Sequence, residues 1–197
     1  MYEELGASGF TPITVAIDRS ADDARPWIEA ARPTHPSLID PWHVVADLYN
    51  VVNVPTDIWI DERGRIARPN DVGFGTDVFR QLTGIDSGKR LATLRAWLDG
   101  RVSALPDDRV RALTTMPSAG HQQARAEFAL GRWLWERGNV DAAGRHFDRA
   151  GTLAPHDFTI RRGTMPLRGV DPMGPEFRKM FAAWTGAGHP YYRTLPE

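Results

Sequence analysis

VNVPTDIWIDERGRI, residues 52–66, is the stretch of this sequence that best indicates its fold. It contains a loop with one proline, Pro55, followed by a run of β-branched and aromatic residues that is typical of a buried strand. A polar turn at Glu62-Arg63-Gly64 separates this run from a second one. The stretch therefore predicts a proline loop and an antiparallel hairpin, with strands at 57–61 and 65–68.

Strand and helix signals flank this hairpin on both sides. The β-branched run at 13–17 predicts a buried strand, and Ser20 followed by Asp23 is a capping-box pattern that predicts the start of a helix. Further expected elements are an extended piece at 36–40, a helix at 42–50, a short helix around 78–82 and a helix at 91–98 closed by Gly100. The order strand, helix, helix, proline loop, hairpin, helix predicts an α/β domain.

With this order and the VPT-strand-IDERGRI motif, residues 1–100 resemble the second half of a thioredoxin-like domain of the TlpA/ResA redoxin type. The resemblance implies a cis Val54–Pro55 bond. It also implies that the main chain of Val54, Pro55 and Thr56 binds a protein thiol or disulfide substrate, or another protein partner. The first strand and the Cys-x-x-Cys turn of the family are missing, so the expected fold is an incomplete thioredoxin-like fold.

The family's reaction, thiol–disulfide exchange, needs a thiolate, and this chain contains no cysteine. No catalytic residue is therefore assigned, and two accounts remain open. In the first, the natural protein is longer and carries a Cys-x-x-Cys or selenocysteine turn upstream of Met1. In the second, the chain is a non-catalytic protein-binding module that uses the proline edge and the helical region. Without the family's first strand and first helix, the strand at 13–17 would have an uncovered edge. This predicts either a homodimer that pairs these strands or a C-terminal region that folds back over them.

The second half of the sequence has a helical character. Pro- and Gly-containing residues 101–120 predict a linker with helical turns at 107–113. Residues 121–197 resemble a tetratricopeptide-like helical region, whose small and large positions match Gly131, Ala143 and Phe147 around a turn at Gly138-Asn139. A last helix is expected at 175–184, and residues 159–173 are expected to be irregular. One helical hairpin must pack on the last helix, the first domain or a partner.

Composition excludes several classes of function. The formal net charge of −1 gives no reason to expect binding to nucleic acid or to an anionic membrane. No stretch approaches the roughly 20 apolar residues of a membrane span, and no signal peptide is visible, so the chain as written is expected to be cytoplasmic. The six histidines lack metal-site spacing and are expected at the surface or at helix caps, without metal or cofactor.

The seven tryptophans lie mostly on predicted apolar stripes and are therefore expected in the core. Trp133 and Trp135 cannot both face one side of a helix. One of them is expected at the outer surface of the helical hairpin or at a contact between the domains.

Overall fold

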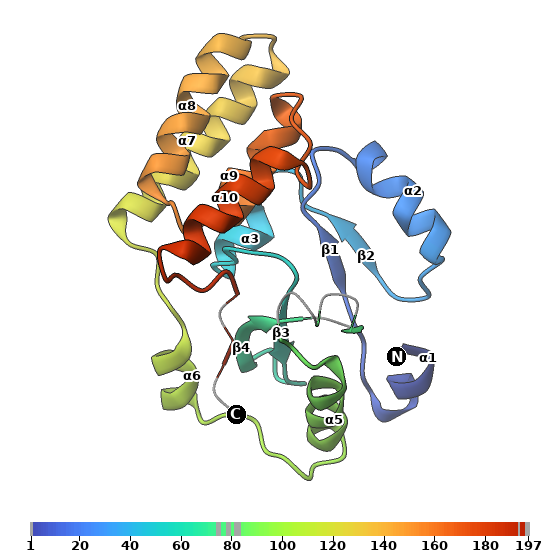
Figure 1. Ribbon diagram of the computed structural model, residues 1–197. Helices are drawn as coiled ribbons and strands as arrows, with labels where there is room; N and C mark the ends of the chain where they lie inside the picture. Colours follow the sequence, from blue (N-terminus) through green and yellow to red (C-terminus); the bar gives the residue numbers. More distant parts are fainter. Residues whose placement is uncertain (1, 74–75, 78–79, 81–83, 193, 196–197) are drawn as a thin grey trace.

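The computed structural model describes residues 2–73, 76–77, 80, 84–192 and 194–195 and shows a mixed α/β fold (Figure 1). The strand-rich half contains α1 (Tyr2–Leu5), the 3-10 turn η1 (Gly6–Ser8), β1 (Thr14–Ala16), α2 (Ala21–Ala31), β2 (Ser37–Ile39), α3 (Val44–Leu48), β3 (Thr56–Ile60), β4 (Ile66–Val72) and α5 (Ser87–Leu98). The helical half contains α6 (Asp107–Leu113), α7 (Ala119–Glu136), α8 (Val140–Leu153), α9 (Phe158–Leu167) and α10 (Pro175–Gly186).

The described strands form two separate two-stranded sheets. β1 and β2 run parallel, with Val15 opposite Leu38, whereas β3 and β4 run antiparallel, with Thr56 opposite Val72. In Figure 1 the β1–β2 pair stands apart from the β3–β4 pair. The expected α/β character is therefore present, but the four strands do not join into one sheet.

The hairpin predicted from residues 52–66 is confirmed. The Val54–Pro55 bond is cis, β3 begins directly after it, and Gly64 closes the turn in the left-handed region at φ +75°. The return strand β4 extends farther than expected, to Val72. It does so because its second part pairs with the start of β3, and Pro69 falls where the pairing register is irregular.

Two helix starts illustrate how local capping works in this chain. Ser20 accepts the Asp23 N–H at 3.3 Å, which confirms the capping box at the start of α2. α3 begins at Val44, later than expected, because the buried Asp40 carboxylate accepts the N–H groups of Val44, Val45 and Ala46. The short helix expected around 78–82 falls largely outside the described residues.

The helical half has a continuous apolar core between α7, α8 and α9. Its buried members are Ala124, Phe128, Ala143, Phe147, Ala150, Ala154, Ile160 and Leu167. The turn between α7 and α8 uses Gly138 in the left-handed region, at φ +78°. α6 lies at the expected helical turns of the linker, and α7 begins at Ala119, just inside the expected linker, where Ser118 caps it. The expected last helix is present as α10.

The expectations for residues 159–173 and for the tryptophans are wrong. Residues 159–173 are not irregular throughout, because α9 occupies Phe158–Leu167 with Asp157 as its cap and buries Ile160 and Leu167 against the helical core. The tryptophans are less buried than expected, since the exposed fractions of Trp27, Trp42 and Trp133 are 78%, 40% and 44%. Trp135 packs partly against the helical core, whereas Trp133 is exposed, as expected for one of that pair.

No helix among the described residues is long and apolar enough to cross a membrane.

Candidate functional site

The loop from Val52 to Thr56 joins α3 to β3 and contains all three residues predicted to bind a partner. Thr56 Oγ1 donates to the Asn53 carbonyl at 2.7 Å, and the Val54 N–H donates to the Asn53 side-chain oxygen at 2.9 Å. The Val52 carbonyl accepts the Phe158 N–H at 2.7 Å, which fixes the loop against the start of α9. Val54, Pro55 and Thr56 are each half-buried, so the loop is a partly accessible surface.

The C-terminal tail, residues 190–192 and 194–195, lies across this loop. Figure 1 shows it descending from α10 toward β4. Asn53 Nδ2 donates to the Tyr191 carbonyl at 2.7 Å, and the Tyr192 hydroxyl donates to the Val54 carbonyl at 3.4 Å. The Leu195 N–H donates to Asp71 Oδ1 at 3.1 Å. The tail thus covers the main chain of Val54, one of the three residues predicted to bind a partner.

Aromatic rings of α9 and α10 hold the tail from its other side. The Tyr191 ring centroid lies 4.5 Å from that of Phe158 and 4.9 Å from that of Phe181, and Trp184 Nε1 donates to the Pro190 carbonyl at 3.0 Å. Burial raises the pKa of Tyr191, although Arg162 opposes this effect. Burial and the neighbouring Tyr191 raise the pKa of Tyr192 to about 12.

A buried ion network lies beneath the loop and the tail. The Asp71 side chain is fully buried and pairs with Arg68 at 2.9 Å and with Arg90, which also reaches Asp57 at 2.7 Å. Burial raises the pKa of Asp71, but the hydrogen bond and charge of Arg90 outweigh it and hold the pKa below its usual range. Asp71 therefore stays ionised and anchors the tail through the Leu195 N–H.

The strand β1 has one edge that is not used by β2. The Thr14 N–H donates to the Pro36 carbonyl and the Ala16 carbonyl accepts the Asp40 N–H, so these two residues turn their main chain toward β2. Because strand residues alternate, the N–H and C=O groups of Val15 point to the opposite edge. No described strand pairs with β1 on that side. Large apolar side chains near this sheet, Ile13 and Leu38, are 60% and 51% exposed.

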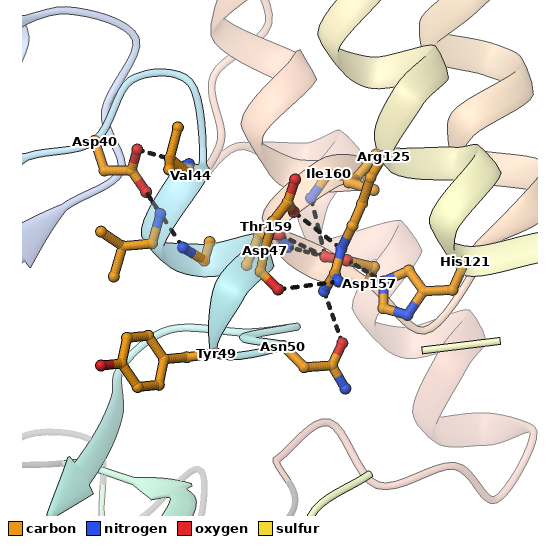
Figure 2. Close-up of polar contacts among 12 residues, drawn as sticks. Asp40, Val44, Asp47, Tyr49, Asn50, His121, Arg125, Asp157, Thr159 and Ile160 are labelled. Carbon is orange, nitrogen blue, oxygen red and sulfur yellow. Dashed lines mark hydrogen bonds and ion pairs between the residues drawn. The ribbon is translucent and has the colours of Figure 1, made fainter. Parts of the chain in front are cut away.

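A second polar cluster joins the two halves where α3 meets α7 and α9 (Figure 2). Asp157 lies 2.7 Å from His121 Nε2 and accepts the N–H groups of Thr159 and Ile160. Arg125 donates to Asn50 at 2.7 Å. Its Nε lies 2.9 Å from Asp47 Oδ1 as an ion pair, without the alignment of a hydrogen bond.

This second cluster is structural. His121 and Asp157 are 2% and 1% exposed, so a substrate cannot reach them. The expectation that the histidines lie at the surface or at caps is therefore wrong for His121, whereas His43 is the N-cap residue of α3, although it is 3% exposed and packs on Phe128. Their neighbours come from elements far away in the sequence, which no local spacing reveals. No group of three or more potential ligands for a metal ion occurs within the described part of the chain.

Comparison of the chain with protein-family models, with curated proteins and with solved structures gives no significant match. The candidate site therefore has to be judged from its own geometry. That geometry brings Val54, Pro55 and Thr56 together at one loop. It adds Asn53, Tyr191 and Tyr192, which the sequence analysis missed although the adjacent tyrosines after α10 were a visible signal.

Proposed function

We propose that residues 1–100 form the protein-binding part of a thioredoxin-like unit of the TlpA/ResA redoxin type. In this proposal the chain binds an extended segment of another protein through its main chain and does not itself exchange disulfides. The observation that carries the proposal is the edge of β1, where the main chain of Val15 points away from β2 and no described strand pairs with it. Such an edge is a template for an added strand.

Three further features support this function. The loop Val54–Thr56 heads β3, which pairs with β4 on one side only among the described strands. Ile13, the residue directly before β1, adds exposed apolar surface next to this strand. The net charge of −1 does not favour a polyanionic partner, so an uncharged main-chain ligand fits better.

The proposal is tested with a permanently unfolded polypeptide that has no free thiol, namely fluorescein-labelled reduced and carboxymethylated α-lactalbumin. Fluorescence polarisation is expected to show saturable binding to the full chain. Val15→Pro removes the N–H at the open edge and is expected to weaken binding about tenfold, because a strand ladder loses a donor. Glu62→Pro is the matched control, since it places proline at the second position of an exposed turn, where proline is favoured.

Equal binding by the Val15→Pro and Glu62→Pro variants would overturn the assignment to the β1 edge. Absence of binding by the unsubstituted chain would overturn the proposed function as a whole.

Thiol–disulfide exchange, the reaction of the resembled family, is the second candidate, and the same open edge favours it. A strand that carries a cysteine and pairs with the open edge of β1 would supply the thiol that this reaction requires. The 197-residue chain alone has no thiol to form a mixed disulfide. It is therefore expected to leave the rate of insulin reduction by dithiothreitol at the uncatalysed level in a turbidity assay. A rate clearly above that level would contradict this expectation.

A further inference from the structure

Part of the contact between the tail and the Asn53–Thr56 loop with the adjoining elements is made by main-chain atoms of the tail. The carbonyls of Pro190 and Tyr191 accept hydrogen bonds from Trp184 and Asn53, and the Leu195 N–H donates to Asp71. Contacts of this kind do not depend on which side chains the bound segment carries. These hydrogen bonds alone would therefore not distinguish one extended segment from another.

The specific part of the contact comes from two adjacent aromatic rings. Tyr191 packs against the rings of Phe158, Phe177 and Phe181, with centroids 4.5, 6.0 and 4.9 Å away. Its hydroxyl is buried close to Arg162 and Asn53 but makes no aligned hydrogen bond. The aligned contacts of the Tyr191 side chain are therefore made by its ring. Tyr192 adds its own ring, 4.8 Å from Tyr191, and its hydroxyl reaches the Val54 carbonyl.

We propose that the Asn53–Thr56 loop and the aromatic face of α9 and α10 form a site for an extended polypeptide segment with two adjacent aromatic residues, which the tail occupies in cis. An outside segment of the same kind binds when it displaces the tail. This inference goes beyond the proposed function, which places a polypeptide at the edge of β1, because it assigns a second polypeptide site at Val54. It adds the class of segment and a built-in competitor.

A tail attached to the end of α10 competes strongly with any free segment. Because the tail is tethered, its effective concentration is on the order of millimolar, and it suppresses weaker binding in trans. Weakening the tail should therefore raise the affinity of the site for an outside segment. This consequence distinguishes a ligand site from a purely structural contact. If the contact were only structural, weakening the tail would not raise the affinity for an outside segment.

The experiment uses a fluorescein-labelled peptide with the sequence of residues 189–197 and a full-length chain that carries Tyr191→Ala and Tyr192→Ala. This variant is expected to bind the peptide at least about tenfold more tightly than the unsubstituted chain does. A control peptide in which both tyrosines are alanine is expected to bind at least about tenfold more weakly to the same variant. Equal affinity of the two chains, or of the two peptides, would overturn the inference.

A second measurement keeps the test decisive if the double variant fails to fold. In the unsubstituted chain, a millimolar concentration of the unlabelled peptide is expected to accelerate amide hydrogen exchange at Tyr191, Tyr192 and Leu195. Exchange in α7 and α8 should not change. Unchanged exchange in the tail at millimolar peptide would overturn the inference.

The α-lactalbumin assay distinguishes this failure from failure of the proposed function. Binding that is sensitive to Val15→Pro, without any displacement of the tail by the peptide, would overturn only the tail site. Light scattering provides a last check, because a dimer that exchanges tails would assign the site to a second copy of this chain and overturn occupation in cis.

Discussion

The α7–α8 hairpin and the β3–β4 hairpin bury their interiors in different ways. Between α7 and α8 the interior is apolar, and Phe128 and Phe147 are each only 3% exposed. In β4 the buried residues include the apolar Ala67 and Val72 but also Asp71, a carboxylate held by Arg68 and Arg90. Two helices that are adjacent in sequence can pack their apolar faces directly against each other. The two-stranded sheet instead depends on groups from α5 and from the tail.

This difference teaches where each half is vulnerable. Substitutions in the apolar cluster destabilise the fold by leaving a cavity or by overpacking. Substitutions in the ion network destabilise it by leaving a buried charge without its partner. Large exposed apolar residues occur in both halves, among them Trp27 and Leu48 in the strand-rich half and Met116 and Val140 in the helical half, so both halves offer apolar surface to a partner.

Truncation of the helical core is expected to have the largest effect. Phe147→Ala should lower the free energy of unfolding by about 3–5 kcal/mol, because it leaves a cavity beside Phe128. Leu38→Ala, in the half-exposed strand β2, should change it by less than about 0.5 kcal/mol. Urea unfolding followed by circular dichroism measures both values. Losses of similar size would show that the two halves are packed alike.

The ion network is expected to give the next largest effect. Arg90→Met should lower the free energy of unfolding by about 3 kcal/mol, because the buried Asp71 carboxylate then keeps only Arg68 as a charged partner. Arg95→Met removes a pair with Glu4 in which both side chains are largely exposed, and should cost less than about 1 kcal/mol. Equal urea midpoints for the two variants would mean that Asp71 does not need Arg90.

Gly131 sharpens the comparison within the helical half. A Cβ added there would lie 2.7 Å from two ring carbons of Phe147, so Gly131→Ala should cost about 1–2 kcal/mol through overpacking despite its better helix propensity. Gly144 in α8 has open space around its Cα, and Gly144→Ala should stabilise the chain by up to about 1 kcal/mol. Thermal melting of the two variants is expected to move in opposite directions.

The smallest expected effect concerns pH at the junction of the halves. Burial lowers the pKa of His43, with Asp157 and Asp40 opposing this effect. The unfolded chain therefore takes up this proton first, and the free energy of unfolding should fall as pH drops below about 6.5. Above that pH the imidazole is neutral in both states and contributes no dependence on pH.

The His43 contribution is isolated by comparing urea midpoints at about pH 7.5 and about pH 5. His43→Asn removes the titrating group and tolerates the left-handed conformation of this residue, so it should reduce the difference between the two midpoints. His189→Asn, at an exposed position, serves as the control and should leave that difference unchanged. A larger difference in the His43 variant would contradict the assignment.

Much of the fold was predictable where the signal is local. The capping pattern of Ser20 and Asp23, the hairpin after Pro55 and the turn at Gly138 each depend on residues within a few positions of one another. α9 was missed because its Arg, Gly and Pro content suggested an irregular segment. What stabilises it is the Asp157 cap and the burial of Ile160 and Leu167 against helices already formed.

By itself, the sequence determined the local elements, the absence of a thiol and the three loop residues Val54, Pro55 and Thr56 as a candidate surface. Only the tertiary structure decided that the tail covers this loop, that His121 is buried against Asp157 and that the four strands form two sheets. The physical reason is distance along the chain. The contact from Asn53 to Tyr191 joins residues 138 positions apart, and the tail that makes it is held from its other side by α9 and α10.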